Sequence, residues 1–225
     1  MSDIVISYDG TYNEDDAVAL GRVFAQAGAE VSLAYVRHAP EEETSREILA
    51  QHEAEELLQR GAELLGDSEV ARHVITDRST PDGLRALAER IGAEAIVFCS
   101  DSHTAQGHVA VGNSAQRLLE GGPVAVAIAP AGFAKASGGV HNVGVVGDGG
   151  AQATAEALAR ALGAEVVAAD HHSVDALVVG SRPEAEDGRV SISAASENLI
   201  EIATCPVLVV PHGRTLSFGG ALATI

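Results

Sequence analysis

The chain has 225 residues, and its 32 acidic and 14 basic side chains give a formal net charge of −18. This charge repels phosphate backbones and anionic membrane surfaces, so we expect no nucleic-acid partner and no membrane association. No apolar run reaches the roughly 18 residues of a membrane span. The chain starts without a signal-like segment, and Cys99 and Cys205 lie in or beside apolar strands. These features predict a cytoplasmic protein with two free thiols.

Short apolar runs alternate with amphipathic segments in the first part of the chain. Strands are predicted at 4–8, 31–36, 74–75, 93–98 and 124–128. Helices are predicted through Ala17 to Phe24 with an end at Gly28, over 43–65, from Thr80 as N-cap with Pro81 in the first turn, and over 113–121. Apolar strands that alternate with helices predict a parallel sheet covered on both faces.

The second part of the chain repeats part of this order. Residues 131–140 are rich in Gly, Ala and Ser and are typical of a linker. A strand over 143–147 then leads to Asp148-Gly149, as the first strand leads to Asp9-Gly10. A helix closing at Gly163 and a strand at 164–167 follow.

An internal repeat is clearest where residues 94–119 align with 175–200 without a gap. Ser100 falls on Ser181, Gly107 on Gly188 and Val109 on Val190. We therefore predict one complete copy over 1–130 and a shortened copy over 141–213, followed by a C-terminal tail over 214–225. The second copy lacks the long helix, the third strand and the third helix, which should leave one face of its sheet poorly covered.

The shortened copy still allows a parallel sheet, because residues 169–175 are long enough to return along a short strand without a helix. Residues 124–128 and 207–210 are apolar edge strands that need a partner or a cover. We expect them to pair within the chain as a pseudo-dimer. The alternative is that each is buried under its own helices, and a homodimer of the whole chain also stays open.

Candidate ligand loops lie where the parallel strands end. One is Asp9-Gly10, whose carboxylate could bind ribose hydroxyls, although Asp-Gly is also a common turn pair. The other is the long loop after the predicted strand 93–98. It enters a helix whose free amides form a natural phosphate cradle.

Four short segments of the sequence are typical of a known family. They are Gly112 to Leu119, Pro123 to Pro130, Val178 to Arg182 and Cys205 to Pro211. With the element order, they make nearly the whole chain resemble the tandem form of the universal stress protein family. The resemblance implies two repeats of an open, doubly wound, parallel five-stranded α/β sheet, of the adenine nucleotide alpha hydrolase-like type, with the second repeat shortened. It also implies a stress-response regulatory role.

Family members that bind ATP carry a Gly-x2-Gly-x9-Gly-Ser/Thr loop, and both copies depart from it. The first copy has Cys99, Ser102, Gly112 and Asn113 at these positions. The second has Gly180, Pro183, Ser193 and Ala194, and Pro183 has no amide hydrogen to offer a phosphate. We therefore expect any nucleotide in the first copy.

The resemblance implies a set of nucleotide-binding residues in the first copy. ATP or AMP would bind there, with Mg²⁺ for ATP because basic residues are scarce; the alternative is that no nucleotide binds. Val36, where the family backbone meets adenine, could equally be a core valine. The set is Asp9, Gly10, Val36, Ser100, Gly107, His108, Gly112, Asn113 and Ser114.

No acid–base or nucleophile arrangement stands out in the sequence, so no catalytic residue is assigned. His171-His172 could bind a metal, but adjacent histidines in a connecting segment are more often solvated. Two further functions stay open. One is an interaction or scaffold protein without nucleotide, and the other, less favoured, is an ATP-hydrolysing enzyme.

Overall fold

The computed structural model describes residues 3–11, 13–38, 44–136, 138–147, 149–170 and 173–219, without the side chains of 44–48. Within these residues one nine-stranded sheet has the order β3-β2-β1-β4-β5-β9-β8-β6-β7. The strands are β1 (Asp3–Ser7), β2 (Glu30–Arg37), β3 (Ala71–Thr76), β4 (Ala95–Cys99), β5 (Ala125–Ala129), β6 (Asn142–Val146), β7 (Glu165–Ala168), β8 (Ala176–Gly180) and β9 (Val207–Val210). The helices are α1 (Glu14–Gln26), α2 (Thr44–Leu65), α3 (Thr80–Ile91), α4 (Asn113–Leu119), α5 (Gly150–Leu162), α6 (Ala194–Glu201) and the 3-10 turn η1 (Phe133–Lys135).

The sheet consists of two parallel halves. Strands β3-β2-β1-β4-β5 are parallel to one another, and so are β7-β6-β8-β9. The halves join through β5 and β9, which are antiparallel and place Ala127 opposite Leu208. The apolar segments 124–128 and 207–210 are thus adjacent strands, and the carboxyl edge of one half lies beside the amino edge of the other.

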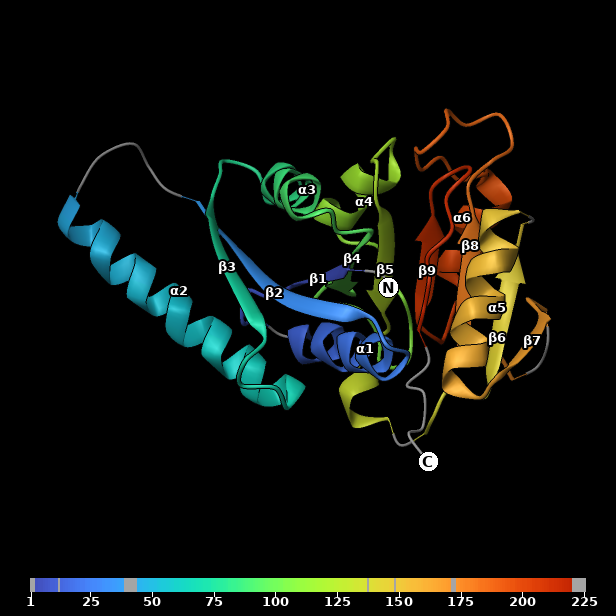
Figure 1. The fold of residues 1–225 in the computed structure, drawn as a ribbon, viewed down its shortest axis with the longest axis horizontal. Coiled ribbons are helices and arrows are strands. Elements are labelled where there is room, and N and C mark those ends of the chain that lie inside the picture. The colour runs from blue at the N-terminus through green and yellow to red at the C-terminus, as the bar shows by residue number, and fades with distance from the viewer. Residues whose placement is uncertain are drawn as a thin grey trace.

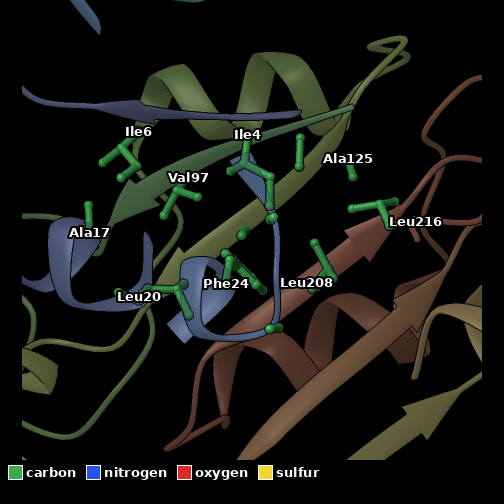
Figure 2. Close-up of a cluster of buried hydrophobic side chains, with 14 of the residues drawn as sticks. Ile4, Ile6, Ala17, Leu20, Phe24, Val97, Ala125, Leu208 and Leu216 are labelled. Atoms are coloured by element: carbon green, nitrogen blue, oxygen red, sulfur yellow. The ribbon is translucent and has the colours of Figure 1, made fainter. Parts of the chain in front are cut away.

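Helices cover both faces of the sheet (Figure 1). One buried cluster contains residues of α1, α2 and α5, and the other contains residues of α3, α4 and α6. The first cluster crosses the boundary between the halves. Figure 2 shows Ile4, Phe24 and Ala125 of the first half near Leu208 and Leu216 of the second. The two halves therefore share one core.

The connection from β7 to β8 is short, as predicted. The described residues between these strands contain no helix. On the α3 side of the second half, where a counterpart of α3 would lie, Val146 and Val174 are only half-buried. Val145, on the opposite face of the same strand, is half-buried as well, so weaker cover of one face stays a prediction.

One local prediction is wrong. The N-cap of α3 is Ser79, whose hydroxyl accepts a hydrogen bond from the Asp82 amide at 3.4 Å, and Thr80 is the first helical residue. Serine and threonine are both common N-cap residues. Ser79 is the N-cap here because its hydroxyl reaches the amide of Asp82, the third residue of the helix. No helix of the described residues is long and apolar enough to cross a membrane.

Candidate functional site

Two loops meet at the carboxyl edge of the first half. The loop after β1 carries Asp9 and Gly10, and the loop after β4 runs from Ser100 to the start of α4. The Asn13 side-chain amide donates to the Asp101 carbonyl at 3.2 Å and joins the loops. The predicted residues of both loops therefore lie at one edge of the sheet.

The Asp9-Gly10 pair forms a turn. Oδ1 of Asp9 accepts a hydrogen bond from the Thr11 amide at 2.9 Å, and Gly10 has a φ of 74°. A positive φ favours glycine, because a Cβ in this conformation meets the backbone. Both residues are exposed. The Asp9 carboxylate thus has a local turn role.

The space behind this turn holds a carboxyl group that sequence reasoning missed. Oε2 of Glu14 accepts hydrogen bonds from the Asp9 amide and, at 2.7 Å, from the Gly10 amide. Only 5% of Glu14 is exposed. Burial, followed by the negative charge of Asp9, raises the pKa of Glu14 to about 9. A carboxyl of the protein therefore accepts hydrogen bonds from both amides of this turn.

Glu14 was not predicted as a site residue because acidic residues are common at the start of a helix. Glu14 opens α1 together with Asp15 and Asp16, and acidic residues in a first turn are explained by the helix dipole alone. Glu14 lies four residues after Gly10, a spacing from which a side chain can reach back to the preceding amides. This resembles the reciprocal contacts of a capping box.

Ser100 is fully buried, and its hydroxyl is used inside the protein. Oγ donates to the Ala129 carbonyl at 2.7 Å and accepts from the Ala110 amide at 3.1 Å. These bonds fix the loop after β4 against the end of β5. A ligand would have to break them to reach this hydroxyl.

The loop after β8 in the second half makes the same contacts. The Ser181 hydroxyl donates to the Val210 carbonyl at 2.8 Å and accepts from the Ser191 amide at 3.1 Å. The Gly107 amide donates to Ala131 at 2.7 Å, and the Gly188 amide donates to His212 at 2.8 Å.

The two loops also reach across the boundary in a reciprocal way. The Val109 amide donates to the Ala203 carbonyl at 3.1 Å, and the Val190 amide donates to the Gly122 carbonyl at 2.9 Å. The side chains of Val109 and Val190 are buried in one cluster. The residues that repeat between the halves thus hold the loops and the junction.

Val36 is a core residue. Its side chain is 6% exposed, in the cluster under α3. A Cβ on Gly83 would lie 3.1 Å from Cγ1 of Val36, which indicates close packing of the helix on the strand. The side chain therefore has a packing role.

The start of α4 is a second accessible part of the predicted set, beside the exposed Asp9 and Gly10. Gly112 is the N-cap and makes no side-chain cap, whereas its counterpart Ser193 accepts from the Ser196 amide at 3.1 Å. A Cβ on Gly112 would meet nothing within 4 Å. Asn113 and His108 are exposed, and Ser114 is half-buried.

The cysteines are free in the structure. Burial, followed by the charge of Glu14, raises the pKa of the Cys99 thiol to about 12, and burial raises that of Cys205 to about 11. Both thiols are therefore protonated near neutral pH and are poor nucleophiles. Among the described residues no group of three or more His, Cys, Asp or Glu could hold a metal, and Asp148, His171 and His172 lie outside these residues.

Comparisons with known proteins agree with this fold. Residues 1–130 match the sequence model of the universal stress protein family. A universal stress protein from Archaeoglobus fulgidus DSM 4304 is 17% identical with a TM-score of 0.59, covering 94% of this chain and 98% of that one. A functionally unknown protein from Pseudomonas aeruginosa PAO1 is 14% identical with a TM-score of 0.61, covering 95% and 93%. Such identities show the fold alone, and none of the curated proteins matches the sequence.

Proposed function

The chain belongs to the universal stress protein family, and we propose that it is a tandem member that regulates partners without binding ATP or AMP in the phosphate loop. The observation that carries this proposal lies in the phosphate loop after β4, where the Ala110 amide donates to the buried Ser100 hydroxyl and is not free for a phosphate. In the neighbouring loop after β1, the Glu14 carboxyl accepts hydrogen bonds from the Asp9 and Gly10 amides, so this turn offers neither amide to a ligand.

The loop after β4 supports the same proposal. Cys99 and Ser102 stand at two of the three glycine positions, and the buried Ser100 hydroxyl is bonded to Ala129. His103 and His108 are the loop's basic side chains, and histidine is a weak phosphate partner at neutral pH. The loop therefore lacks two of the glycines that let amides approach a polyphosphate, and it carries little of the positive charge that a polyphosphate needs.

The tandem interpretation is supported by topology and by paired contacts. The order β7-β6-β8-β9 corresponds to β2-β1-β4-β5 without the edge strand β3. Ser100 and Ser181 make equivalent bonds to the strand that follows in each half. On this basis we assign a complete copy to 1–130 and a shortened copy to 141–213, which pair within the chain through β5 and β9.

A second candidate function is nucleotide binding in the first copy, and the uncapped start of α4 at Gly112 favours it. Free amides at a helix start attract phosphate groups. The two functions differ in one measurable property, which is affinity for ATP or AMP.

The test combines nucleotide analysis with calorimetry. Freshly purified protein is denatured and assayed for released adenine nucleotide, and native protein is titrated with AMP and with ATP and Mg²⁺. We expect no released nucleotide and no saturable heat at this loop. Binding that Gly112→Val removes would overturn the proposal. Gly138→Val is the matched control, because a Cβ at Gly138 also meets nothing within 4 Å and its φ is not positive.

A further inference from the structure

A separate pocket of about 900 Å³ opens over α1, between α2 and η1. Of the nucleotide-binding residues predicted from the sequence, only Gly10 lines it. Val36 and Gly112 are not among its lining residues. The pocket therefore adjoins the phosphate loop, which contributes Gln106 to its lining, but it lies away from the start of α4 at Gly112.

Basic side chains are concentrated here in a chain that carries few of them. Arg22, Arg60 and Lys135 all line the pocket. Arg22 donates to the Leu64 carbonyl near the end of α2, which gives it a capping role. Among the described residues, the side chains of Arg60 and Lys135 have neither an ion-pair partner nor a hydrogen-bond partner. In a protein of charge −18, two unpaired cations in one pocket favour an anion.

Two of the carboxylates in the pocket already have partners. Asp16 is 3% exposed, and its two oxygens accept from the Gly132 and Ala134 amides at 2.7 Å each. Glu63 accepts from the Gln59 side chain at 3.3 Å.

The remaining polar groups suit hydroxyls. Asp15 is exposed in the pocket lining, and Tyr8 also lines the pocket. Burial, followed by the charge of Asp15, raises the pKa of the Tyr8 phenol, and the charge of Arg60 acts in the opposite direction. A carboxylate accepts only, and a phenol both donates and accepts, so both can bond a ligand hydroxyl.

We propose that this pocket binds a small anion on a hydroxylated scaffold, of the kind found in sugar phosphates and hydroxycarboxylates. Arg60 and Lys135 contact the phosphate or carboxylate, while Asp15 and Tyr8 contact hydroxyls. Such a site would let a small molecule regulate the protein through this pocket. It does not depend on whether the phosphate loop binds nucleotide.

The experiment is isothermal titration at low ionic strength with glucose 6-phosphate, with citrate and with inorganic phosphate. We expect saturable binding of glucose 6-phosphate or citrate, and the arm that binds more tightly identifies phosphate or carboxylate as the preferred group. Arg60→Gln and Lys135→Gln should each weaken binding about tenfold, as expected for loss of one charge-assisted contact. Arg160→Gln, at an exposed position on α5, is the control and should bind as the unmodified chain does.

Three results would overturn this site. They are absence of binding by both organic probes, equal affinity of the Arg60 and Arg160 variants, and inorganic phosphate binding as tightly as glucose 6-phosphate. ATP is also a hydroxylated anion, so any ATP binding is assigned by variant. Loss in Arg60→Gln places ATP in this pocket, whereas loss in Gly112→Val places it in the phosphate loop.

Discussion

The ring of Phe24 on α1 stacks on the ring of Phe218, with centroids 5.8 Å apart and planes inclined by 19°. Phe218 follows β9 near the end of the chain, so the contact ties the tail of the second half to the first. Leu216 is 2% exposed, and its amide donates to the Thr154 hydroxyl on α5 at 3.0 Å. Residues 214–219 thus cross from α5 to α1 over the strand pair β5–β9.

Loss of this aromatic contact should destabilise the whole protein. Phe218 is 8% exposed, and removal of a buried phenylalanine ring costs about 3 kcal/mol or more. We therefore expect Phe218→Ala to lower the free energy of unfolding by about 3 kcal/mol in urea denaturation. Thr215→Ala, at an exposed position of the same segment, should change it little. Equal stability of the two variants would show that the tail contributes no binding energy to the junction.

The approach of the tail to Gly28 provides an independent test. Gly28 has a φ of 85°, and a Cβ there would lie 1.6 Å from the Gly219 carbonyl oxygen. Gly92 has a φ of 75°, and its Cβ would meet nothing within 4 Å. Alanine at either position incurs the left-handed backbone cost of about 1–2 kcal/mol, but only Gly28→Ala must also displace the tail.

Gly28→Ala should therefore lower the unfolding free energy more than Gly92→Ala in the full chain. In a chain that ends at residue 213, the extra cost should disappear, because the clashing carbonyl is gone. Urea denaturation of the four proteins measures this coupling. An extra cost that persists after truncation would place its cause within α1 and not in the tail.

The sequence alone could predict most strands and helices because their apolar patterns recur every few residues. The apolar character of 124–128 and 207–210 predicted adjacent strands, and β5 and β9 are paired. The tail was harder to interpret. Leu216 and Phe218 alternate with polar residues, which indicates an extended segment. The contact of Phe218 with α1 could not be predicted, because it depends on the packing of one half of the sheet against the other.

The candidate site could be predicted less well for a related reason. A family motif indicates where the loops of a site lie. The hydrogen bonds that each side chain of these loops makes depend on residues that are distant in the sequence. The Ser100 hydroxyl bonds to Ala129, 29 residues away, and Asp16 bonds to Gly132. Alignment of residues 94–119 with 175–200 offered one usable signal, since the shared residues Ser100 and Ser181 make equivalent hydrogen bonds.

That role can be measured in both halves. Ser100→Ala would leave the Ala110 amide without its partner, and Ser181→Ala would do the same to the Ser191 amide. Loss of a hydrogen bond costs about 0.5–1.5 kcal/mol, and these amides are half-buried, so each variant should lower the unfolding free energy by about 1 kcal/mol. Ser102→Ala, at an exposed loop position, is the control. A loss in one half only would contradict the proposed equivalence of the copies.

The buried Glu14 carboxyl should make stability depend on pH. Its pKa rises from 4.5 to about 9 on folding, because burial and the charge of Asp9 favour the protonated form. The folded chain then holds a proton that the unfolded chain has lost, so this contribution is complete below about pH 4.5 and falls as the pH rises toward 9. A tenfold difference in proton affinity between the folded and unfolded chains corresponds to about 1.4 kcal/mol of unfolding free energy.

Glu14→Gln should remove this dependence, because a neutral amide oxygen can still accept from the Asp9 and Gly10 amides. We expect the variant to be more stable than the unmodified chain near pH 8 by about 1 kcal/mol or more, with the gap closing near pH 5. Urea denaturation across this range measures it, and Glu89→Gln, at an exposed site on α3, should keep the original pH dependence. A gap that stays constant with pH would mean that Glu14 is ionised in the folded protein. The carboxylate would then be held by the two amides in the way that they would hold a bound anion.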